Sequence, residues 1–254
     1  MADRPALVVH AAAPVDSRLI SVEPVGDVAV VRLQRPPANA LDLELLARML
    51  EVLEELRDAD PRAVVLVGSG SFFSGGLDVK VLPGLDEDGK RTMAEGINRM
   101  LADWYGFPRP VVCAVNGHAV AGGLVLVLCG DRRIGPTVGA FGLTEVRLGV
   151  PYPANAIELL RAELTPAAAR LLALSPGLVE PAAAQALGVV DELAPPEEVE
   201  PRALELAADL ATLPGQAFTL TKAGLRAEAL ASMRRAADGV DPVVRSWVEE
   251  LRPG

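Results

Sequence analysis

The alternation of hydrophobic and polar positions divides the chain into short strands and amphipathic helices. Residues 19–25 and 27–34 alternate apolar and polar side chains on either side of Gly26, a pattern typical of two strands joined by a tight turn. Between residues 41 and 60, apolar side chains recur every three or four positions, and Asp42 precedes them as a candidate N-cap. This third segment is therefore predicted to be a helix.

The rest of the chain continues this alternation and then becomes mainly helical. Residues 63–70 and 110–117 are short apolar runs that end in glycine, so both are predicted to be buried strands. Helices are expected near 89–105 and over 122–130, followed by a strand and turn over 132–144. Helical patterns then dominate, over 153–163, 166–174, 181–187, 197–213 and 216–237. This order of elements predicts an α/β core with a helical C-terminal region.

Composition narrows the class of protein. The 254 residues suffice for one large domain, half of them are hydrophobic, and no apolar run approaches the ~20 residues that span a bilayer. The net charge of -10 argues against a general nucleic-acid binder, although it leaves room for one anionic ligand held locally. Cys113 and Cys129 lie in apolar runs, as reduced thiols of a cytoplasmic protein do. We therefore expect a cytoplasmic protein with neither a membrane nor a nucleic acid as partner.

Most familiar catalytic motifs are missing from the sequence. The histidines are His10, in the expected N-terminal arm, and His118; there is no G-x-S-x-G motif, no P-loop and no metal-ligand spacing. What remains is two glycine turns, at 75–76 and 122–123, and one carboxylate, Glu145, in the apolar context AFGLTEVRLGV. Backbone N–H groups at such turns can stabilise an oxyanion, and a carboxylate in apolar surroundings is a poised base because desolvation raises its pKa. No metal site is expected.

Four segments, in order, carry a resemblance to a known family. They are RPPANALD (35–42), FFSGGLDVK (72–80), AVNGHAVAGGLVLVLCGDRRI (114–134) and FGLTEVRLGVPYP (141–153). Together they resemble the RP-x-x-NAL, F-x-x-G-x-D-x-K, NG-x-A-x-GGG and FG-x-x-E-x-x-x-G segments of the crotonase superfamily, also called the enoyl-CoA hydratase/isomerase family. The resemblance covers about residues 20 to 160.

The resemblance implies a fold and an assembly. The expected fold is an α/β, crotonase-like spiral of ββα units with a C-terminal helical trimerisation region. Its expected divisions are an N-terminal arm over 1–17, the spiral core over 18–194 and the helical region over 195–254. The resemblance also implies a homo-oligomer, either a trimer or a hexamer.

The resemblance further implies an acyl-CoA thioester as substrate, with coenzyme A as part of the substrate and no separate cofactor. The backbone N–H groups of Leu77 and Gly122 would hold the thioester oxygen, and Glu145 would be the catalytic base. The same segments supply the expected substrate-binding residues Asn39, Ala40, Gly75, Gly76, Asp78, Lys80, Gly123 and Val125. Each residue also has a structural interpretation: Asp78 could tie down its loop, Lys80 could be solvated, and Glu145 could be a surface charge. Lys222 is a conjectural phosphate contact, because the F-x-E-K-R type of C-terminal ending is missing.

The residue at position 125 separates the activities of this family. Hydratases use two glutamates, and the positions that match them here are Val125 and Glu145. One glutamate suffices to move a double bond, because it can take a proton from C2 of a 3-enoyl-CoA and return it at C4. The sequence therefore favours an enoyl-CoA isomerase over a hydratase. Two alternatives stay open: a hydratase or other enzyme with a further acid, such as Asp78 or Glu95, and a non-catalytic acyl-CoA-binding protein in which Glu145 is exposed or paired with Arg147.

Overall fold

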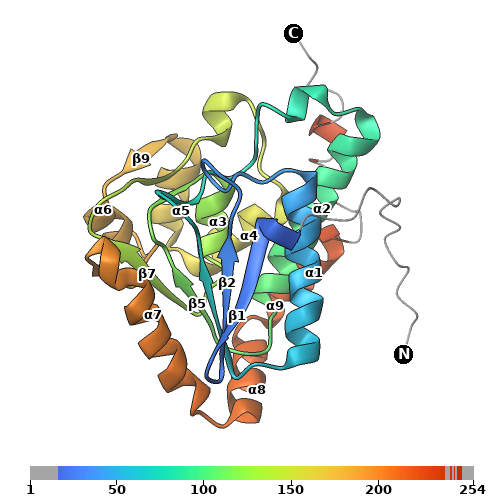
Figure 1. The fold of residues 1–254 in the computed structure, drawn as a ribbon. Coiled ribbons are helices and arrows are strands. Elements are labelled where there is room, and N and C mark those ends of the chain that lie inside the picture. The colour runs from blue at the N-terminus through green and yellow to red at the C-terminus, as the bar shows by residue number, and fades with distance from the viewer. Residues whose placement is uncertain (1–16, 238–240, 242, 244, 248–254) are drawn as a thin grey trace.

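The computed structural model describes residues 17–237, 241, 243 and 245–247, and shows two sheets wrapped by helices (Figure 1). The strands are β1 (Ile20–Val25), β2 (Val28–Leu33), β3 (Ala63–Val67), β4 (Phe72–Ser74), β5 (Val111–Ala114), β6 (His118–Val120), β7 (Arg132–Pro136), β8 (Phe141–Leu143), β9 (Gly177–Val179) and β10 (Glu192–Ala194). The helices are α1 (Leu43–Ala59), α2 (Glu87–Tyr105), α3 (Gly122–Val127), α4 (Ala154–Glu163), α5 (Pro166–Leu174), α6 (Pro181–Ala186), α7 (Pro196–Ala211), α8 (Gly215–Leu225) and α9 (Ala227–Arg235). Three 3₁₀ turns complete the described elements: η1 (Ser17–Leu19), η2 (Leu82–Gly84) and η3 (Glu145–Leu148).

The strand order confirms the predicted spiral of ββα units. The larger sheet has the order β1-β2-β3-β5-β7-β10, and the smaller one has the order β4-β6-β8-β9. The pairs β3 and β4, β5 and β6, and β7 and β8 each send one strand to the larger sheet and the next to the smaller sheet. Because α2 and α3 connect successive pairs, each turn of the chain repeats the same strand, strand and helix order. All neighbours along β2, β3, β5, β7 and β10 are parallel, whereas β1 and β2 form the predicted antiparallel hairpin.

Alternate residues of the large sheet enter two separate cores. Val31 and Leu33 of β2 belong to the larger core, which also holds the buried faces of α1, α2 and α4. Val28 and Val30 point to the opposite face, where α7 packs with Ala203 and residues four positions apart on the same face. Figure 1 shows α7 covering one side of the sheet and α1 the other. The first helix of the C-terminal region is thus a layer of the main fold.

Buried ion pairs join the last two described helices to the core. Lys222 of α8 pairs with Asp131 at 2.6 Å, and Arg226 pairs with the same carboxylate at 3.1 Å. The Arg226 guanidinium also lies over the Tyr105 ring of α2, 3.9 Å from its centre. Arg226 interrupts the helix that the pattern predicted over 216–237, and this segment forms α8 and α9 instead.

Other sequence-based predictions are confirmed, except that one helix ends earlier than predicted. The helix predicted over 41–60 is α1, and the Asp42 side chain caps it by accepting a hydrogen bond from the Leu45 N–H. The helix predicted over 122–130 ends already at Val127. Cys113 and Cys129 are buried free thiols as predicted, and burial raises the pKa of Cys113 to about 12. Apart from Ser17, the expected N-terminal arm lies outside the described residues.

No helix in the described part of the chain is long and apolar enough to cross a membrane.

Candidate active site

The first half of the site is a loop that carries Leu77 past the end of β4. Asn39 holds the residues before this loop in place. Its side chain is fully buried and donates to the carbonyls of Ser69, Phe72 and Phe73. The backbone at Leu41 then pairs with the loop, because its N–H donates to the Gly76 carbonyl at 2.7 Å and its carbonyl accepts from the Asp78 N–H at 2.8 Å. The N–H of the intervening Leu77 takes part in neither of these bonds.

Two glycines let this loop approach the start of α3. A Cβ added to Gly76 would lie 2.5 Å from the Gly122 nitrogen, and Gly76 has a φ of +75°. A Cβ added to Gly122 would lie 3.8 Å from the Leu77 nitrogen. Gly123 is equally restricted, since a Cβ there would overlap the carbonyl of Ser74. The two glycine turns that are distant in the sequence therefore meet at one point.

The N–H groups of Leu77 and Gly122 are both free at this meeting point. Among the described residues, neither donates to a backbone or side-chain acceptor. Ala121, directly before Gly122, has a φ of +52°, an uncommon conformation for alanine that sets the direction of the next peptide group. Because α3 has only six residues, its contribution comes from the free N–H groups of its first turn rather than from a long helix dipole. Two free N–H groups that meet at one point can stabilise an oxyanion.

Glu145 opens η3 immediately after β8 and lies in the same pocket. Its carboxylate accepts from the Thr144 N–H at 2.8 Å, and only 9% of the residue is exposed. Burial raises the pKa of Glu145, while hydrogen bonds from its own N–H, the Thr144 N–H and the Tyr152 hydroxyl partly oppose this effect. No ion pair to Glu145 is found within the described part of the chain, and Arg147 instead donates to the Pro176 carbonyl at 2.6 Å. Glu145 is thus a buried, unpaired carboxylate, as a base requires.

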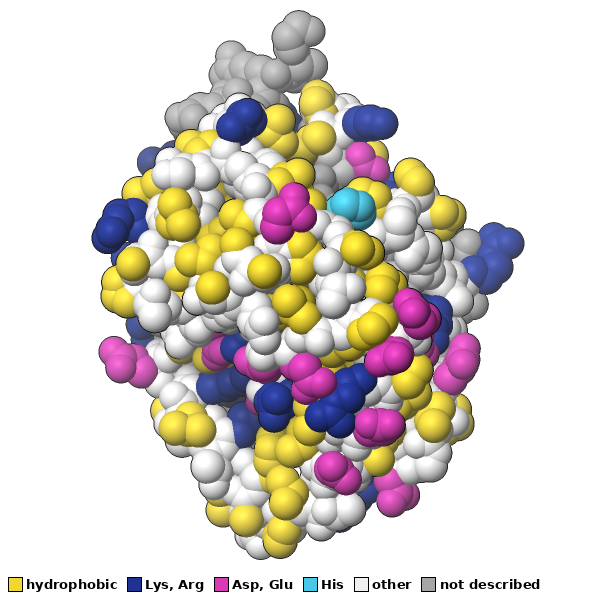
Figure 2. Space-filling model, turned by 90° about the vertical axis from the view of Figure 1, so that its left-hand side faces the viewer, with side chains coloured by type: hydrophobic (Ala, Val, Ile, Leu, Met, Phe, Trp, Pro, Cys, Tyr) yellow, Lys and Arg dark blue, Asp and Glu magenta, His cyan; other side chains and the backbone are white. Residues whose placement is uncertain are grey.

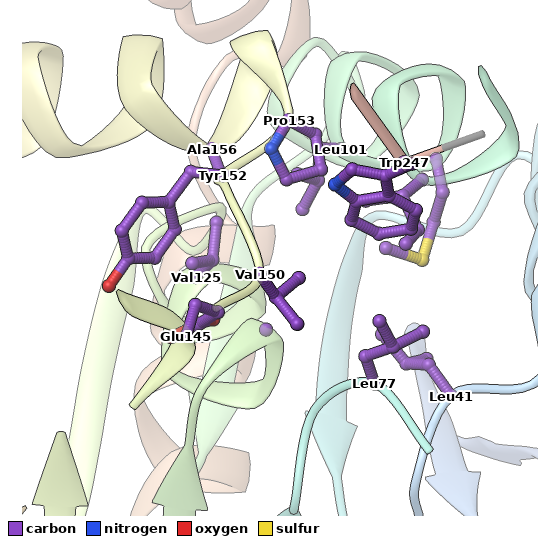
Figure 3. A pocket seen from close by; sticks show the side chains of 13 residues that line it. Leu41, Leu77, Leu101, Val125, Glu145, Val150, Tyr152, Pro153, Ala156 and Trp247 are labelled. Atoms are coloured by element: carbon purple, nitrogen blue, oxygen red, sulfur yellow. The ribbon is translucent and has the colours of Figure 1, made fainter. Parts of the chain in front are cut away.

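The pocket itself is narrow and almost wholly apolar. Its volume is about 30 Å³, and its lining includes Leu77, Gly122, Val125 and Glu145. Figure 3 shows Glu145 and Leu77 on opposite sides of the pocket, with Val125 next to Glu145. Within the described residues, Glu145 is the one carboxylate that lines it. The other lining residues are Leu41, Ile97, Met100, Leu101, Val150, Tyr152, Pro153, Ala156 and Trp247.

Several other sequence candidates have partners that define them more closely. Asp78 pairs with Arg35 at 3.1 Å, and Lys80 is exposed on the same loop. Gly75 is fixed by its N–H, which donates to the Ala38 carbonyl, and Ala40 accepts from Arg35 through its carbonyl. His118 begins β6 with its ring 4.8 Å from that of Phe72.

The suggestion of Lys222 as a phosphate contact is wrong. Its side chain is 7% exposed, and its ammonium group donates to Asp131 and to the Arg109 carbonyl. The motif context gave no sign of this, because the partners lie about a hundred residues earlier in the chain.

Two pocket residues escaped the sequence interpretation. Tyr152 belongs to the quoted segment 141–153 but has no role in the family pattern as stated above. Trp247 comes from the far C-terminal end and shows no signal beyond its being one of two tryptophans. Among the described residues, no group of three or more histidines, cysteines, aspartates or glutamates is placed to hold a metal ion.

A spiral of ββα units with paired free N–H groups beside a buried glutamate defines the class: the fold is that of the crotonase superfamily. The family model for enoyl-CoA hydratase/isomerase matches residues 24–240. The chain belongs to the enoyl-CoA hydratase/isomerase family.

Individual relatives carry both names of this family. A putative enoyl-CoA hydratase of Thermus thermophilus is 38% identical over 205 residues, which are 78% of this chain and 79% of that protein. A structure described as the apo form of an enoyl-CoA isomerase of Mycobacterium tuberculosis is 30% identical, with a TM-score of 0.83, over 91% of this chain and 99% of that one. A second structure of that protein, described as probable enoyl-CoA hydratase EchA3, is 31% identical with a TM-score of 0.83 over 87% and 94%.

Proposed function

We propose that the protein is an enoyl-CoA isomerase that moves the double bond of a 3-enoyl-CoA to the 2-position. The observation that carries the proposal is that a single buried glutamate, Glu145, lines the pocket together with the apolar Val125. A water molecule that adds across a double bond needs polar groups to hold and activate it, and Val125 provides none. Proton transfer within the substrate needs only one base.

The proposed reaction uses Glu145 twice. The carboxylate first takes a proton from C2, and the electrons of that C–H bond move toward the thioester carbonyl to form a dienolate. The N–H groups of Leu77 and Gly122 stabilise the negative oxygen, a contribution of ~3 kcal/mol for each such donor. The protonated Glu145 then returns the proton to C4, and the double bond ends between C2 and C3. Coenzyme A takes part only as a portion of the substrate.

The environment of Glu145 supports both steps. A buried carboxylate with a raised pKa is a stronger base than a solvated one. Once protonated, it is also shielded from exchange of that proton with water. The non-catalytic alternative called for an exposed Glu145 or one paired with Arg147, whereas Arg147 is bonded to Pro176. The geometry therefore supports turnover.

Hydration is the second candidate, and the observation that favours it is the position of Tyr152. The Tyr152 side chain lines the same pocket and its hydroxyl opposes the rise in the pKa of Glu145, although it also donates to the Ala173 carbonyl at 3.5 Å. These two groups could hold a water in the absence of a second glutamate. Asp78 is a weaker candidate for that role because it is paired with Arg35.

Paired assays on the purified protein test the choice. Isomerisation of a 3-enoyl-CoA and hydration of the matching 2-enoyl-CoA are measured for the wild type, for Glu145→Gln and for a control, Glu205→Gln, which changes an exposed glutamate of α7. We expect isomerisation to exceed hydration, and Glu145→Gln to reduce it by about 10²–10⁴-fold, the usual contribution of a general base. Efficient hydration would favour the hydratase instead.

We also propose that the protein forms a homo-oligomer, as a trimer or a hexamer. Large apolar side chains are exposed on η3, α5 and β9, which are neighbours in the fold: Val146, Leu148, Leu171, Leu174 and Leu178. Figure 2 faces the side of the molecule that carries α5 and β9, and apolar side chains there are interrupted by few charges. Burying such a surface between copies would stabilise the assembly.

A further inference from the structure

Trp247 enters the pocket from a part of the chain about a hundred residues beyond Glu145. The residue is only 1% exposed, and its indole N–H donates to the Pro151 carbonyl at 2.9 Å. Figure 3 shows its ring next to Leu101 and Pro153 and across the pocket from Leu77. The indole N–H is thus satisfied by a backbone carbonyl, and the ring lines the pocket.

A buried carboxylate a few residues earlier fixes this segment to the two helices that line the pocket. Asp241 accepts from the Asn98 side chain of α2 and from the Ala154 N–H at the start of α4, both at 2.8 Å. Its second oxygen accepts from the Val243 N–H at 2.9 Å. Asn155 of α4 reinforces the joint, because its side-chain amide donates to the Asn98 carbonyl at 2.6 Å. Asp241 is 6% exposed, so solvent competes little with these bonds.

The position of the catalytic groups gives the direction of the acyl chain. With the thioester oxygen between the N–H groups of Leu77 and Gly122, and with C2 at Glu145, the rest of the chain must continue among the apolar residues of the pocket. The apolar lining includes Met100 and Leu101 of α2 and Trp247, which lies across the pocket from Leu77 (Figure 3). The pocket is narrow, with a volume of about 30 Å³. The tryptophan therefore stands where the distal carbons of a longer acyl chain would lie.

We infer that Trp247, held in place by Asp241, closes the distal end of the acyl pocket and makes the protein selective for short acyl chains. This inference rests on the proposed function, because it assumes that an acyl-CoA occupies this pocket. Trp247 acts on specificity alone; it takes no part in proton transfer.

Binding of saturated acyl-CoAs tests the inference without turnover. Calorimetry compares butyryl-, hexanoyl-, octanoyl- and decanoyl-CoA with free coenzyme A for the wild type, Trp247→Ala and Trp247→Phe. The affinity of the wild type should not increase with chain length from butyryl-CoA to decanoyl-CoA. In Trp247→Ala, decanoyl-CoA should gain on the order of tenfold or more relative to butyryl-CoA, since the added methylenes can then be buried. Trp247→Phe should fall between the two proteins.

Two further variants separate this effect from a general loss of packing. Trp104→Phe changes the other buried tryptophan, which does not line the pocket, and should leave the ratio of decanoyl-CoA to butyryl-CoA affinity as in the wild type. Asp241→Asn keeps Trp247 but weakens its anchor, so it should shift the ratio in the same direction as Trp247→Ala by a smaller factor. It also serves if Trp247→Ala does not fold.

The possible results distinguish this inference from the proposed function. An unchanged affinity ratio in both Trp247→Ala and Asp241→Asn, or a wild type that binds decanoyl-CoA more tightly than butyryl-CoA, would overturn the role of Trp247 while leaving the isomerase proposal intact. Chain-length selectivity that depends on Trp247 without any turnover would support the inference and count against the isomerase. Failure of every acyl-CoA to bind more tightly than free coenzyme A would overturn both.

Discussion

At the scale of single residues, the site depends on what is missing as much as on what is present. Gly76 lacks a side chain where a Cβ would meet the Gly122 nitrogen, and Val125 lacks the carboxylate that hydration would use. Glu145 supplies the one carboxylate of the pocket within the described residues. Each of these positions can be tested by a substitution that changes one property.

Gly76→Ala is expected to remove activity by blocking the oxyanion hole. The new methyl group would lie 2.5 Å from the Gly122 nitrogen, so one donor must move, at a cost of about 10²–10³ in kcat. Gly70→Ala is the matched control, because Gly70 has a similar φ of +69° but open space around its Cβ position. Both variants should lose roughly 1–2 kcal/mol of stability from the backbone conformation. Equal activity of the two variants would contradict the assignment.

Glu145→Gln is expected to raise the melting temperature at neutral pH. Burial raises the folded-state pKa of Glu145 above its unfolded-state value, so ionisation of this group destabilises the fold. That destabilisation is absent below the unfolded-state pKa of about 4.3 and complete above the folded-state pKa. Thermal unfolding from pH 4 to 8 should therefore show a gain for the variant that disappears toward acid pH. A variant less stable than the wild type at pH 8 would contradict this.

At the scale of elements, short connections position the site and buried charges hold the C-terminal helices. Asp131, between α3 and β7, binds Lys222 and Arg226 and also accepts from the Val111 N–H at 2.8 Å. Burial lowers the pKa of Lys222 to about 8, and Asp131 opposes that shift. One carboxylate thus connects α8 and α9 to the strands that flank the pocket helix.

Asp131→Ala is expected to destabilise the protein by about 3–5 kcal/mol, because it leaves the buried Lys222 without its carboxylate and Arg226 with only the more distant Glu163, at 3.9 Å. Urea unfolding measures the change. Arg161→Ala removes an exposed ion pair of α4, with a side chain 72% exposed, and should change stability little. A similar, small effect of both substitutions would show that the buried cluster is not what holds α8 and α9.

At the scale of the whole molecule, the apolar face over η3, α5 and β9 accounts for the proposed assembly. Leu174 is 67% exposed and Leu178 is 57% exposed, and both would be covered in an oligomer. Leu174→Glu should therefore shift the mass measured by light scattering toward the 26.6 kDa subunit. Val25→Glu, at the hairpin between β1 and β2, is the control and should leave the mass unchanged. A wild-type protein that is already monomeric would refute the proposal.

The sequence predicted the parts of the fold that have a long enough pattern. The hairpin of β1 and β2 and the buried face of α1 follow from periods of two and about three and a half residues. The strands β4, β6 and β9 have three residues each, too few for any period to show, and none of them was predicted. Glu145 and the glycine turns could be located from local motifs. The roles of Trp247 and Lys222 could not, because long-range packing alone places them.

The most direct test of the central claim follows hydrogen through the reaction. A 3-enoyl-CoA carrying deuterium at C2 is converted by the enzyme in ordinary water, and the product is analysed by mass spectrometry and NMR at the shortest times that give measurable turnover. If Glu145 alone shuttles the proton, part of the deuterium appears at C4 of the 2-enoyl-CoA. Product that carries only solvent hydrogen at C4 from the first measurement, or a 3-hydroxyacyl-CoA as the main product, would contradict the account.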